Sequence, residues 1–504
     1  MCARRTCPTA TTGGDPAAKG DTSMVRAIVS LFLALACVCA IPQARAVDPP
    51  QDPPTLQDIE ARVRRLETLL GETTQQTPAD LASLDQRLRV LEQKLAAQPA
   101  IVAATPPPPA KEVEPVESPS FTFDDKGLAW KSSIGGGSEL RLRGLFQYDG
   151  RQWFDDGDVQ DDTFLLRRAE PTIEGNFGEL LAYRFTGQFA GDSASTVDAY
   201  LDVRLDPRAT VRLGKTKVPL GLERLQSSAT TSQVENGLPS ELAPGRDIGV
   251  QLQGKFDGPG LSYALGVYNG TVDGRDGAST NPDGDFEVAA RVFFEPWKGG
   301  DTALSGLGFG LAATHGDKTG SGNDFLPRYR TPGQVTFFSY RNDVAAAGTH
   351  DRWSPQMYWY VGRFGVLGEY IASRQEVARN GVGDAIDNRA WQISTSFAVT
   401  GEPVGYQGIT KPDNPFALGE SGWGALELTA RYGELDIDDR AFPVFANPAS
   451  AADGARSWGV GFNWYLNAHF KLVADYLHTT FDAAPDGIRR DAEHILLTRA
   501  QFSF

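Results

Sequence analysis

Cysteine is almost missing from this sequence of 504 residues. The four cysteines, Cys2, Cys7, Cys37 and Cys39, all lie among the first 39 residues. The remainder of the chain therefore cannot carry a disulfide scaffold, a thiolate-bound zinc or iron–sulfur site, or a cysteine nucleophile.

Long hydrophobic runs and an excess of basic residues are missing too. No apolar stretch of about 20 residues follows residue 46, which argues against membrane-spanning helices beyond that point. The 64 acidic residues outnumber the 48 basic ones and give a formal net charge of −16. Because binding a polyanion needs a basic face, we expect no nucleic-acid partner.

Catalytic and metal-binding patterns are also absent from the sequence. The five histidines show no H-x-x-x-H spacing, and neither a G-x-S-x-G elbow nor a Walker-type glycine loop occurs. The acidic loop at residues 281–285 lacks the full twelve-residue calcium pattern. We therefore expect no catalytic residues, no metal site and no cofactor, and we predict that the protein is not an enzyme.

The N-terminal region predicts export. From Met24, a short positive region is followed by an apolar segment at residues 27–40 and an A-x-A cleavage signal at residues 44–46. We predict a signal peptide over residues 1–46, in which residues 1–23 represent an overlong N-terminus. A buried helix and a lipoprotein signal are the alternatives, but polar Pro- and Asp-rich sequence follows at once, and neither Cys37 nor Cys39 has a leucine three positions before it.

Residues 47–98 contain two runs of apolar residues at alternating spacings of three and four. The first run extends from Leu56 to Leu70 and the second from Leu81 to Leu95. This heptad pattern predicts an α-helical coiled coil that serves as an oligomerisation segment, with a hairpin within one chain as the alternative. Residues 99–120 are rich in proline and predict an extended linker.

From residue 121 to residue 504 the hydrophobic period changes to two. Segments of about ten residues, bounded by Gly, Asp, Asn or Pro, alternate between apolar and polar side chains, as in transmembrane β-barrels. They are residues 140–148, 181–189, 197–205, 211–213, 248–256, 261–267, 286–294, 307–313, 391–399, 458–466, 470–476 and 496–504. A soluble β-sandwich also alternates, but long acidic loops that alternate with short turns, and a last strand ending in Phe504, favour an all-β, antiparallel outer-membrane barrel.

The polar positions of these strands predict which side chains face the lumen. The lumen arginines are predicted to be Arg141, Arg143, Arg168, Arg184, Arg204, Arg212, Arg291, Arg431 and Arg499. Guanidinium groups stay charged and bind oxyanions with two hydrogen bonds, so this set predicts an anion path. Eight carboxylates share the same phase, so some arginines are expected only to stiffen the wall. Aromatic residues near strand ends predict interfacial girdles: Trp297, Trp353, Tyr358, Trp359, Tyr360 and Trp464.

Several runs resemble the phosphate-selective porin O/P family. The most specific is residues 212–226, RLGKTKVPLGLERLQ, and the others are residues 198–204, 244–252, 266–270 and 458–466. The resemblance covers roughly residues 140–504 and implies a trimeric porin of about 16 strands, with a loop folded into the lumen and arginines along an anion path. Residues 226–246 are the candidate for that loop, and the constriction residues are predicted to be Lys215, Lys217, Arg224, Ser227 and Ser228.

The function expected from these features is passive diffusion of small inorganic anions, in particular phosphate or polyphosphate, through a water-filled pore. A general diffusion porin without phosphate preference and a structural barrel tethered by its stalk are the alternatives. We expect the barrel in the outer membrane of a Gram-negative bacterium and the coiled coil in the periplasm. The expected partners are outer-membrane lipid, lipopolysaccharide, two further copies in a homotrimer, and the outer-membrane assembly machinery through Phe504.

Overall fold

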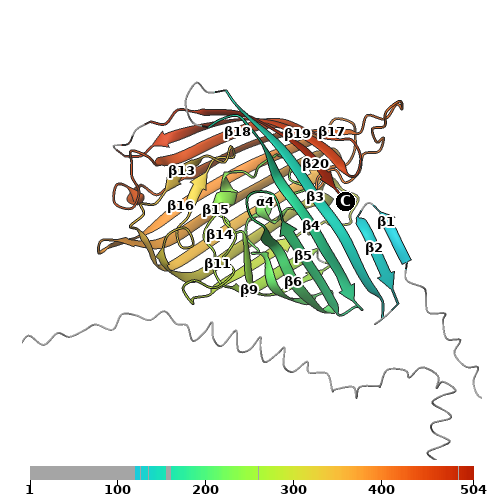
Figure 1. Cartoon of the computed structure of the whole chain (residues 1–504), viewed down its shortest axis with the longest axis horizontal. Coiled ribbons are helices and arrows are strands. Elements are labelled where there is room, and N and C mark those ends of the chain that lie inside the picture. The colour runs from blue at the N-terminus through green and yellow to red at the C-terminus, as the bar shows by residue number, and fades with distance from the viewer. Residues whose placement is uncertain are drawn as a thin grey trace, which may run out of the picture. The chain divides into compact units, whose positions relative to one another are not determined.

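A computed structural model describes residues 120–504, except 125, 134–135, 155–159, 259, 486 and 488. The predicted signal peptide, coiled coil and linker lie outside the described residues, apart from Ser120. The main sheet has 18 strands. Two of them, β1 (Ser120–Asp124) and β2 (Gly127–Ser132), form a hairpin, and the other sixteen form an antiparallel barrel, as predicted (Figure 1).

The barrel strands are connected in sequence order around the wall. They are β3 (Ser138–Trp153), β4 (Thr163–Phe177), β5 (Leu181–Gln188), β6 (Ser195–Asp206), β7 (Ala209–Lys217), β8 (Arg246–Phe256), β9 (Leu261–Tyr268), β10 (Glu287–Phe294), β11 (Leu307–Ser321), β14 (Ala345–Val361), β15 (Phe364–Arg379), β16 (Val382–Ala398), β17 (Ala425–Asp436), β18 (Ala452–Tyr465), β19 (Phe470–Ala483) and β20 (Glu493–Ser503). A separate pair, β12 (Arg328–Arg330) and β13 (Thr336–Ser339), lies in a connection.

Strand β3 closes the barrel because its two halves pair with different partners. Its second half, from Leu145 to Trp153, pairs with β20, and its first residues pair with β2. The terminal residue continues the ladder, since Gly144 and Phe504 exchange two backbone hydrogen bonds of 3.0 and 3.1 Å. Closure removes the free edges that an open sheet would expose in a membrane.

Gly144 leaves the space that the ring of Phe504 occupies. A Cβ at residue 144 would lie 2.6 Å from Cε1 of Phe504, so Gly144→Val is expected to displace the ring and to lower barrel stability by about 1–3 kcal/mol. Loss of the heat-resistant folded band on a denaturing gel at a lower temperature measures this effect. Gly368→Val is the matched control, because its nearest neighbour would be Met357 Cγ at 3.6 Å. Equal melting of the two variants would contradict the prediction.

The side chains of the wall alternate between an exposed apolar face and a covered polar face. On β19, Lys471 and Asp475 point inward and are buried, whereas Leu472 and Tyr476 point outward. Large outward residues exposed by more than a third recur on most strands. This distribution is the reverse of that of a soluble protein and places lipid outside and water inside.

Two aromatic girdles follow the outer face. Strands β14, β16 and β18 each carry two outward aromatic residues. The lower girdle, nearer the end of the barrel that holds Phe504, contains Trp359, Phe397 and Trp464, and the upper girdle contains Trp353, Trp391 and Trp458. The predicted girdle positions of Tyr358 and Tyr360 are wrong. Tyr358 points inward and stacks on Tyr406 in the lumen at 5.3 Å, and Tyr360 lies beside it.

The two ends of the barrel differ in the lengths of their connections. The end that holds Phe504 has the short turns at residues 178–180, 207–208, 257–260, 362–363 and 466–469, whereas the opposite end has residues 218–245, 269–286, 322–344 and 437–451. Short turns are typical of the periplasmic end and long loops of the extracellular end. Two longer connections at the periplasmic end, residues 295–306 and 399–424, and one short turn at the extracellular end, residues 380–381, depart from this rule. Among the described residues, no helix is long and apolar enough to span a membrane.

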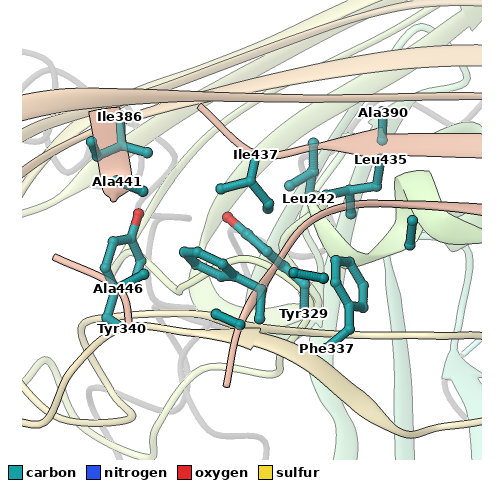
Figure 2. Packing of buried hydrophobic residues seen from close by; sticks show 14 of the residues in the cluster. Leu242, Tyr329, Phe337, Tyr340, Ile386, Ala390, Leu435, Ile437, Ala441 and Ala446 are labelled. Atoms are coloured by element: carbon teal, nitrogen blue, oxygen red, sulfur yellow. The ribbon is translucent and has the colours of Figure 1, made fainter. Parts of the chain in front are cut away.

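A hydrophobic core joins the extracellular connections to the wall (Figure 2). It contains Leu242, Tyr329 and Phe337 from the connections, packed against wall residues such as Ile386 and Leu435. These side chains are at most 1% exposed. The connections are therefore a packed layer with a fixed position, and this layer restricts the extracellular opening of the lumen.

Candidate permeation pathway

The connection at residues 218–245, called the constriction loop below, folds into the barrel (Figure 1). It contains the helix α4 (Leu222–Leu225) and the 3-10 helix η2 (Leu238–Glu241). Gly221 precedes α4 with a φ of 82°, a conformation that favours glycine and that turns the chain inward from β7. Predicted residues 226–246 therefore cover most of the observed loop.

A buried carboxylate, Glu223, fixes the first part of the loop to the wall. It accepts hydrogen bonds from Nη1 of Arg431 (2.9 Å), Nε2 of Gln392 (2.9 Å) and the backbone N–H of Gly237 (2.8 Å). Glu369 on β15 accepts from the backbone N–H groups that begin α4. Because buried charges need partners, these contacts hold the loop in one position.

A second buried carboxylate, Glu235, fixes the other side of the loop. Its Oε1 lies 2.7 Å from Nε of Arg167 and 3.3 Å from Nη2 of Arg151. Burial would raise the pKa of Glu235, but the guanidinium groups of Arg167, Arg499 and Arg168 outweigh it and hold the pKa far below its usual range. This carboxylate therefore stays ionised, and its ion pairs persist, well into the acidic range.

The loop crosses the whole lumen and also bonds to the far wall. Oδ2 of Asp475 accepts from the N–H of Val234 (2.6 Å), and Nδ2 of Asn463 donates to the carbonyl of Ser232 (2.8 Å). Two strands further around the wall from Asp475, Gln147 on β3 donates to the carbonyl of Ser228 at 2.9 Å. The cavities of the lumen thereby lie on the side of strands β3–β10.

A second segment enters the lumen from the periplasmic end. In the connection at residues 399–424, the hydroxyl of Tyr406 donates to the carbonyl of Leu222 (2.5 Å), and its own carbonyl accepts from Gln226 Nε2 (2.7 Å). Thr230 donates to Oε1 of Gln407 at 3.1 Å. The lumen is thus narrowed by two connections that meet from opposite ends.

Two cavities lie in the part of the lumen that the constriction loop does not fill, and their volumes are about 650 and 350 Å³. The larger, periplasmic cavity is lined by Phe504 and by the short turn at Pro207, and the smaller, extracellular cavity by Arg275 and Arg330 of the long connections. Both cavities are lined by Glu170, Lys217, Ser228 and Arg246. These four residues therefore surround the narrow place where the cavities adjoin.

Basic side chains predominate in both cavities. The larger cavity has seven basic residues (Arg143, Arg184, Arg212, Lys217, Arg246, Lys255, Arg291) and two carboxylates (Glu170, Asp198). The smaller has seven (Arg167, Arg168, Lys217, Arg224, Arg246, Arg275, Arg330) and four carboxylates (Glu170, Glu235, Glu241, Asp276). The lumen is thus positive although the chain as a whole is acidic.

Some carboxylates that do not line the cavities form ion pairs with these arginines. Asp202 holds Arg212 with two bonds of 2.7 and 2.8 Å, and Glu174 lies 3.3 and 3.4 Å from Arg143 and Arg184. Neither Asp202 nor Glu174 lines the cavity, whereas the three arginines do. The carboxylates therefore fix the guanidinium groups in position and leave the positive charge toward the water.

The comparisons with known proteins decide the family. The sequence profile described as "Phosphate-selective porin O and P" matches residues 140–504. This chain belongs to that porin family. Porin O of Pseudomonas aeruginosa is 23% identical to this porin over 379 residues, which cover 68% of this chain and 82% of the relative. The match and the barrel together make the chain a Gram-negative outer-membrane protein and a channel, not an enzyme.

Two solved structures similar to this porin are an outer-membrane channel and an anion-selective porin. The channel DcaP of Acinetobacter baumannii has a TM-score of 0.47 and 14% identity, covering 75% of this chain and 100% of that chain. The anion-selective porin of Comamonas acidovorans has a TM-score of 0.46 and 13% identity, covering 73% and 100%.

The structure separates the predicted arginines into three groups. Arg143, Arg168, Arg184, Arg212 and Arg291 line the cavities. Arg431 and Arg499 point into the barrel but lie under the constriction loop, 7% and 3% exposed, and line neither cavity. Arg141, bound to Asp124, and the exposed Arg204 are on β3 and β6 and also line neither cavity.

The predicted constriction residues are brought together, with one exception. Lys217 and Ser228 border both cavities, Ser227 lines the larger one, and Arg224 lines the smaller one. Lys215 lines neither, and its ammonium lies 3.4 Å from the carbonyl of Gly277 in another connection. Sequence reasoning missed Arg246 at the narrow place. The sequence did contain an indication of this role, because Arg246 is the last residue of the segment predicted to fold into the lumen.

Glu241 gives this porin a pH-dependent charge in the smaller cavity. Burial raises the pKa of this carboxyl above its ordinary value of 4.5, although Arg330 and Arg224 oppose the shift. As the pH falls from neutral toward 4.5, Glu241 is expected to gain a proton before an ordinary glutamate does. The cavity becomes more positive, and the preference for anions increases. Reversal potentials in a salt gradient measure this, and a pH response that survives Glu241→Gln would contradict it.

Proposed function

We propose that this porin is a passive channel for small anions and that it favours phosphate. The observation that carries the proposal is the narrow place, where Lys217, Arg246 and Ser228 face one carboxylate, Glu170, between two cavities that each have seven basic residues. A cation entering either cavity meets like charges, whereas an anion is attracted along the whole path.

The donors at the narrow place suit an oxyanion. Nζ of Lys217 donates to the carbonyls of Arg224 (2.9 Å) and Gln226 (2.5 Å), which fixes it at the point where Lys217 lines both cavities. Arg246 is held by Asp198 through Nε at 2.8 Å, and it lines both cavities. Two fixed cations and the hydroxyl of Ser228 can together replace part of the hydration shell of phosphate.

Transport also requires that the anion leave the narrow place. Glu170, 3.3 Å from Arg168, lies at the same point and weakens the binding of a phosphate dianion. Arginines continue on both sides, with Arg224 toward the extracellular end and Arg212 toward the periplasmic end. A series of moderate sites gives faster passage than one tight site.

A planar-bilayer recording of the purified porin tests both parts of the proposal. In a potassium chloride gradient, the reversal potential is expected to have the sign of anion permeation. Millimolar phosphate is then expected to reduce the chloride current, because it occupies the narrow place for longer. A reversal potential of the opposite sign rejects the anion channel. A chloride current insensitive to phosphate rejects the phosphate preference and leaves a general anion porin.

The proposal includes the assembly in which the channel works. It is a homotrimer in contact with lipid and lipopolysaccharide, with residues 47–98 in the periplasm and Phe504 read by the outer-membrane assembly machinery. The two backbone bonds that join Phe504 to Gly144 at the barrel seam support the last point, since the final residue completes closure. The mass of the purified complex in detergent, measured with and without residues 47–98, tests the trimer and the part that the coiled coil plays in it.

A further inference from the structure

The long periplasmic connection has a second part that turns outward. Residues 414–423, called the outer turn below, follow the segment that reaches the lumen. The backbone N–H of Phe416 donates to the carbonyl of Leu466 (2.7 Å), and Nε1 of Trp464 donates to the carbonyl of Trp423 (2.7 Å). The rings of Phe416 and Trp464 meet edge to face at 5.9 Å. The outer turn therefore lies on the lower aromatic girdle.

The outer turn is folded and is closed by backbone hydrogen bonds. Gly424 closes it by donating to the carbonyl of Asn414 at 2.8 Å, and a Cβ at Gly422 would lie only 2.1 Å from the carbonyl oxygen of Pro415. A segment closed so tightly holds its side chains in fixed directions.

Its apolar side chains nevertheless have no protein neighbours that cover them. Leu418 is 90% exposed and Trp423 is 72% exposed. In water, such exposure of two large side chains on a rigid turn is unfavourable. Indole and leucine side chains beside a girdle are typical of the membrane interface, where the apolar part enters lipid and the polar part stays near water.

We propose that the outer turn inserts Leu418 and Trp423 into the interfacial region of the periplasmic lipid leaflet. Lipid is the occupant because the patch continues the outward face of β17 and β18, where Leu428 is 48% exposed and Phe462 is 40% exposed. A second copy of the chain fits less well, since two side chains offer far less area than a stable protein interface needs. Glu420 and Lys411, both exposed, remain at the level of the headgroups.

The contact has a consequence for the channel. The same connection places Gln407 in the lining of the larger cavity and Tyr406 against the constriction loop. Contact with lipid on the outside of the barrel therefore stabilises the position of residues 399–424, the connection that narrows the lumen from the periplasmic end. The lipid contact itself does not depend on which ions pass, so it and the anion proposal can fail separately.

Depth-dependent quenching of a fluorescent label tests the contact. The four cysteines, all within the first 39 residues, are replaced by serine, and Leu418→Cys provides one thiol for an environment-sensitive fluorophore. The purified chain is placed in phosphatidylcholine vesicles with a nitroxide either near the headgroup or near the middle of the acyl chain. We expect the headgroup-proximal nitroxide to quench at least about twofold more than the deep one, with little quenching by aqueous iodide.

Two further positions calibrate the depth scale. Val460→Cys lies on the lipid face of β18 between the girdle residues Trp458 and Trp464, and it is expected to be quenched by the deep nitroxide. Asp324→Cys lies in an exposed extracellular connection and is expected to be quenched by iodide alone. If Leu418→Cys prevents folding, a label at the neighbouring exposed residue, Ala417→Cys, gives the same readout. Quenching at the outer turn by iodide alone overturns the proposal, and so does protection from both quenchers, which would indicate a protein cover.

Discussion

Lys217→Glu is expected to abolish or reverse the ion preference of the channel. Lys217 is one of the two basic residues at the narrow place, and like Arg246 and Glu170 it lines both cavities. At roughly 8 Å and an effective dielectric constant of about 20, one unit charge changes the energy of a passing ion by about 2 kcal/mol, and inversion doubles this. Since about 1.4 kcal/mol corresponds to a factor of ten, a change of about 4 kcal/mol should lower the chloride-to-potassium permeability ratio by on the order of 1,000-fold.

The measurement is the reversal potential in a potassium chloride gradient, with two variants as references. Lys217→Met removes the charge without inverting it and should give an intermediate ratio. Lys255→Glu introduces the same change in the larger cavity, away from the narrow place, and should have a much smaller effect. If Lys255→Glu and Lys217→Glu alter the ratio equally, the whole vestibule rather than the narrow place sets selectivity, and the assignment of the constriction is incorrect.

Most of the membrane-facing strands could be predicted from the sequence. Apolar and polar side chains must alternate along a strand wherever one of its faces meets lipid and the other meets water. Four strands, β4, β14, β15 and β17, were absent from the predicted segments. On β15, the inward residues Ile371 and Val377 are buried in the core beneath the extracellular connections. An apolar residue on both faces removes the period of two, so the signal is weakest where loops cover the lumen side.

For the same reason, the sequence could predict that these arginines point to the lumen side of their strands. It could not predict which of them are accessible to water. Alternation indicates the side to which Arg431 and Arg212 point, and it is the same side. What separates them is the constriction loop, which covers one and leaves the other facing the cavity. The path of that loop depends on contacts with residues about 200 positions away, such as the bond from Arg431 to Glu223, and no local pattern encodes them.

The second infolded connection could not be predicted either. Residues 399–424 are rich in Gly and Pro and resemble any exposed loop. In contrast, the inward positions of Tyr358 and Tyr360 follow from the sequence once Trp359 is assigned outward, because neighbours on a strand point to opposite sides. The error there came from treating three consecutive aromatic residues as one girdle.

Arg431→Met is expected to release the constriction loop without unfolding the barrel. Both Arg431 and Glu223 have side chains only 5% exposed, and removal of one partner leaves a buried charge, which costs about 3–5 kcal/mol. The loop can avoid this cost by moving away from the wall, whose strand pairing does not involve it. We expect a larger single-channel conductance, noisier open currents and weaker anion preference, because Lys217 loses the loop carbonyls that fix it.

Single-channel recording and thermal unfolding together check this prediction. Arg374→Met removes an exposed ion pair, at 3.7 Å from Asp387, and should leave conductance and noise unchanged. The double variant Arg431→Met with Glu223→Gln removes both buried charges and should recover part of the quiet, selective current, because the cost arises from the unpaired carboxylate and not from the missing guanidinium. Quiet currents of normal size in Arg431→Met alone would show that the remaining contacts, from Glu235 and Asp475, are enough to hold the loop.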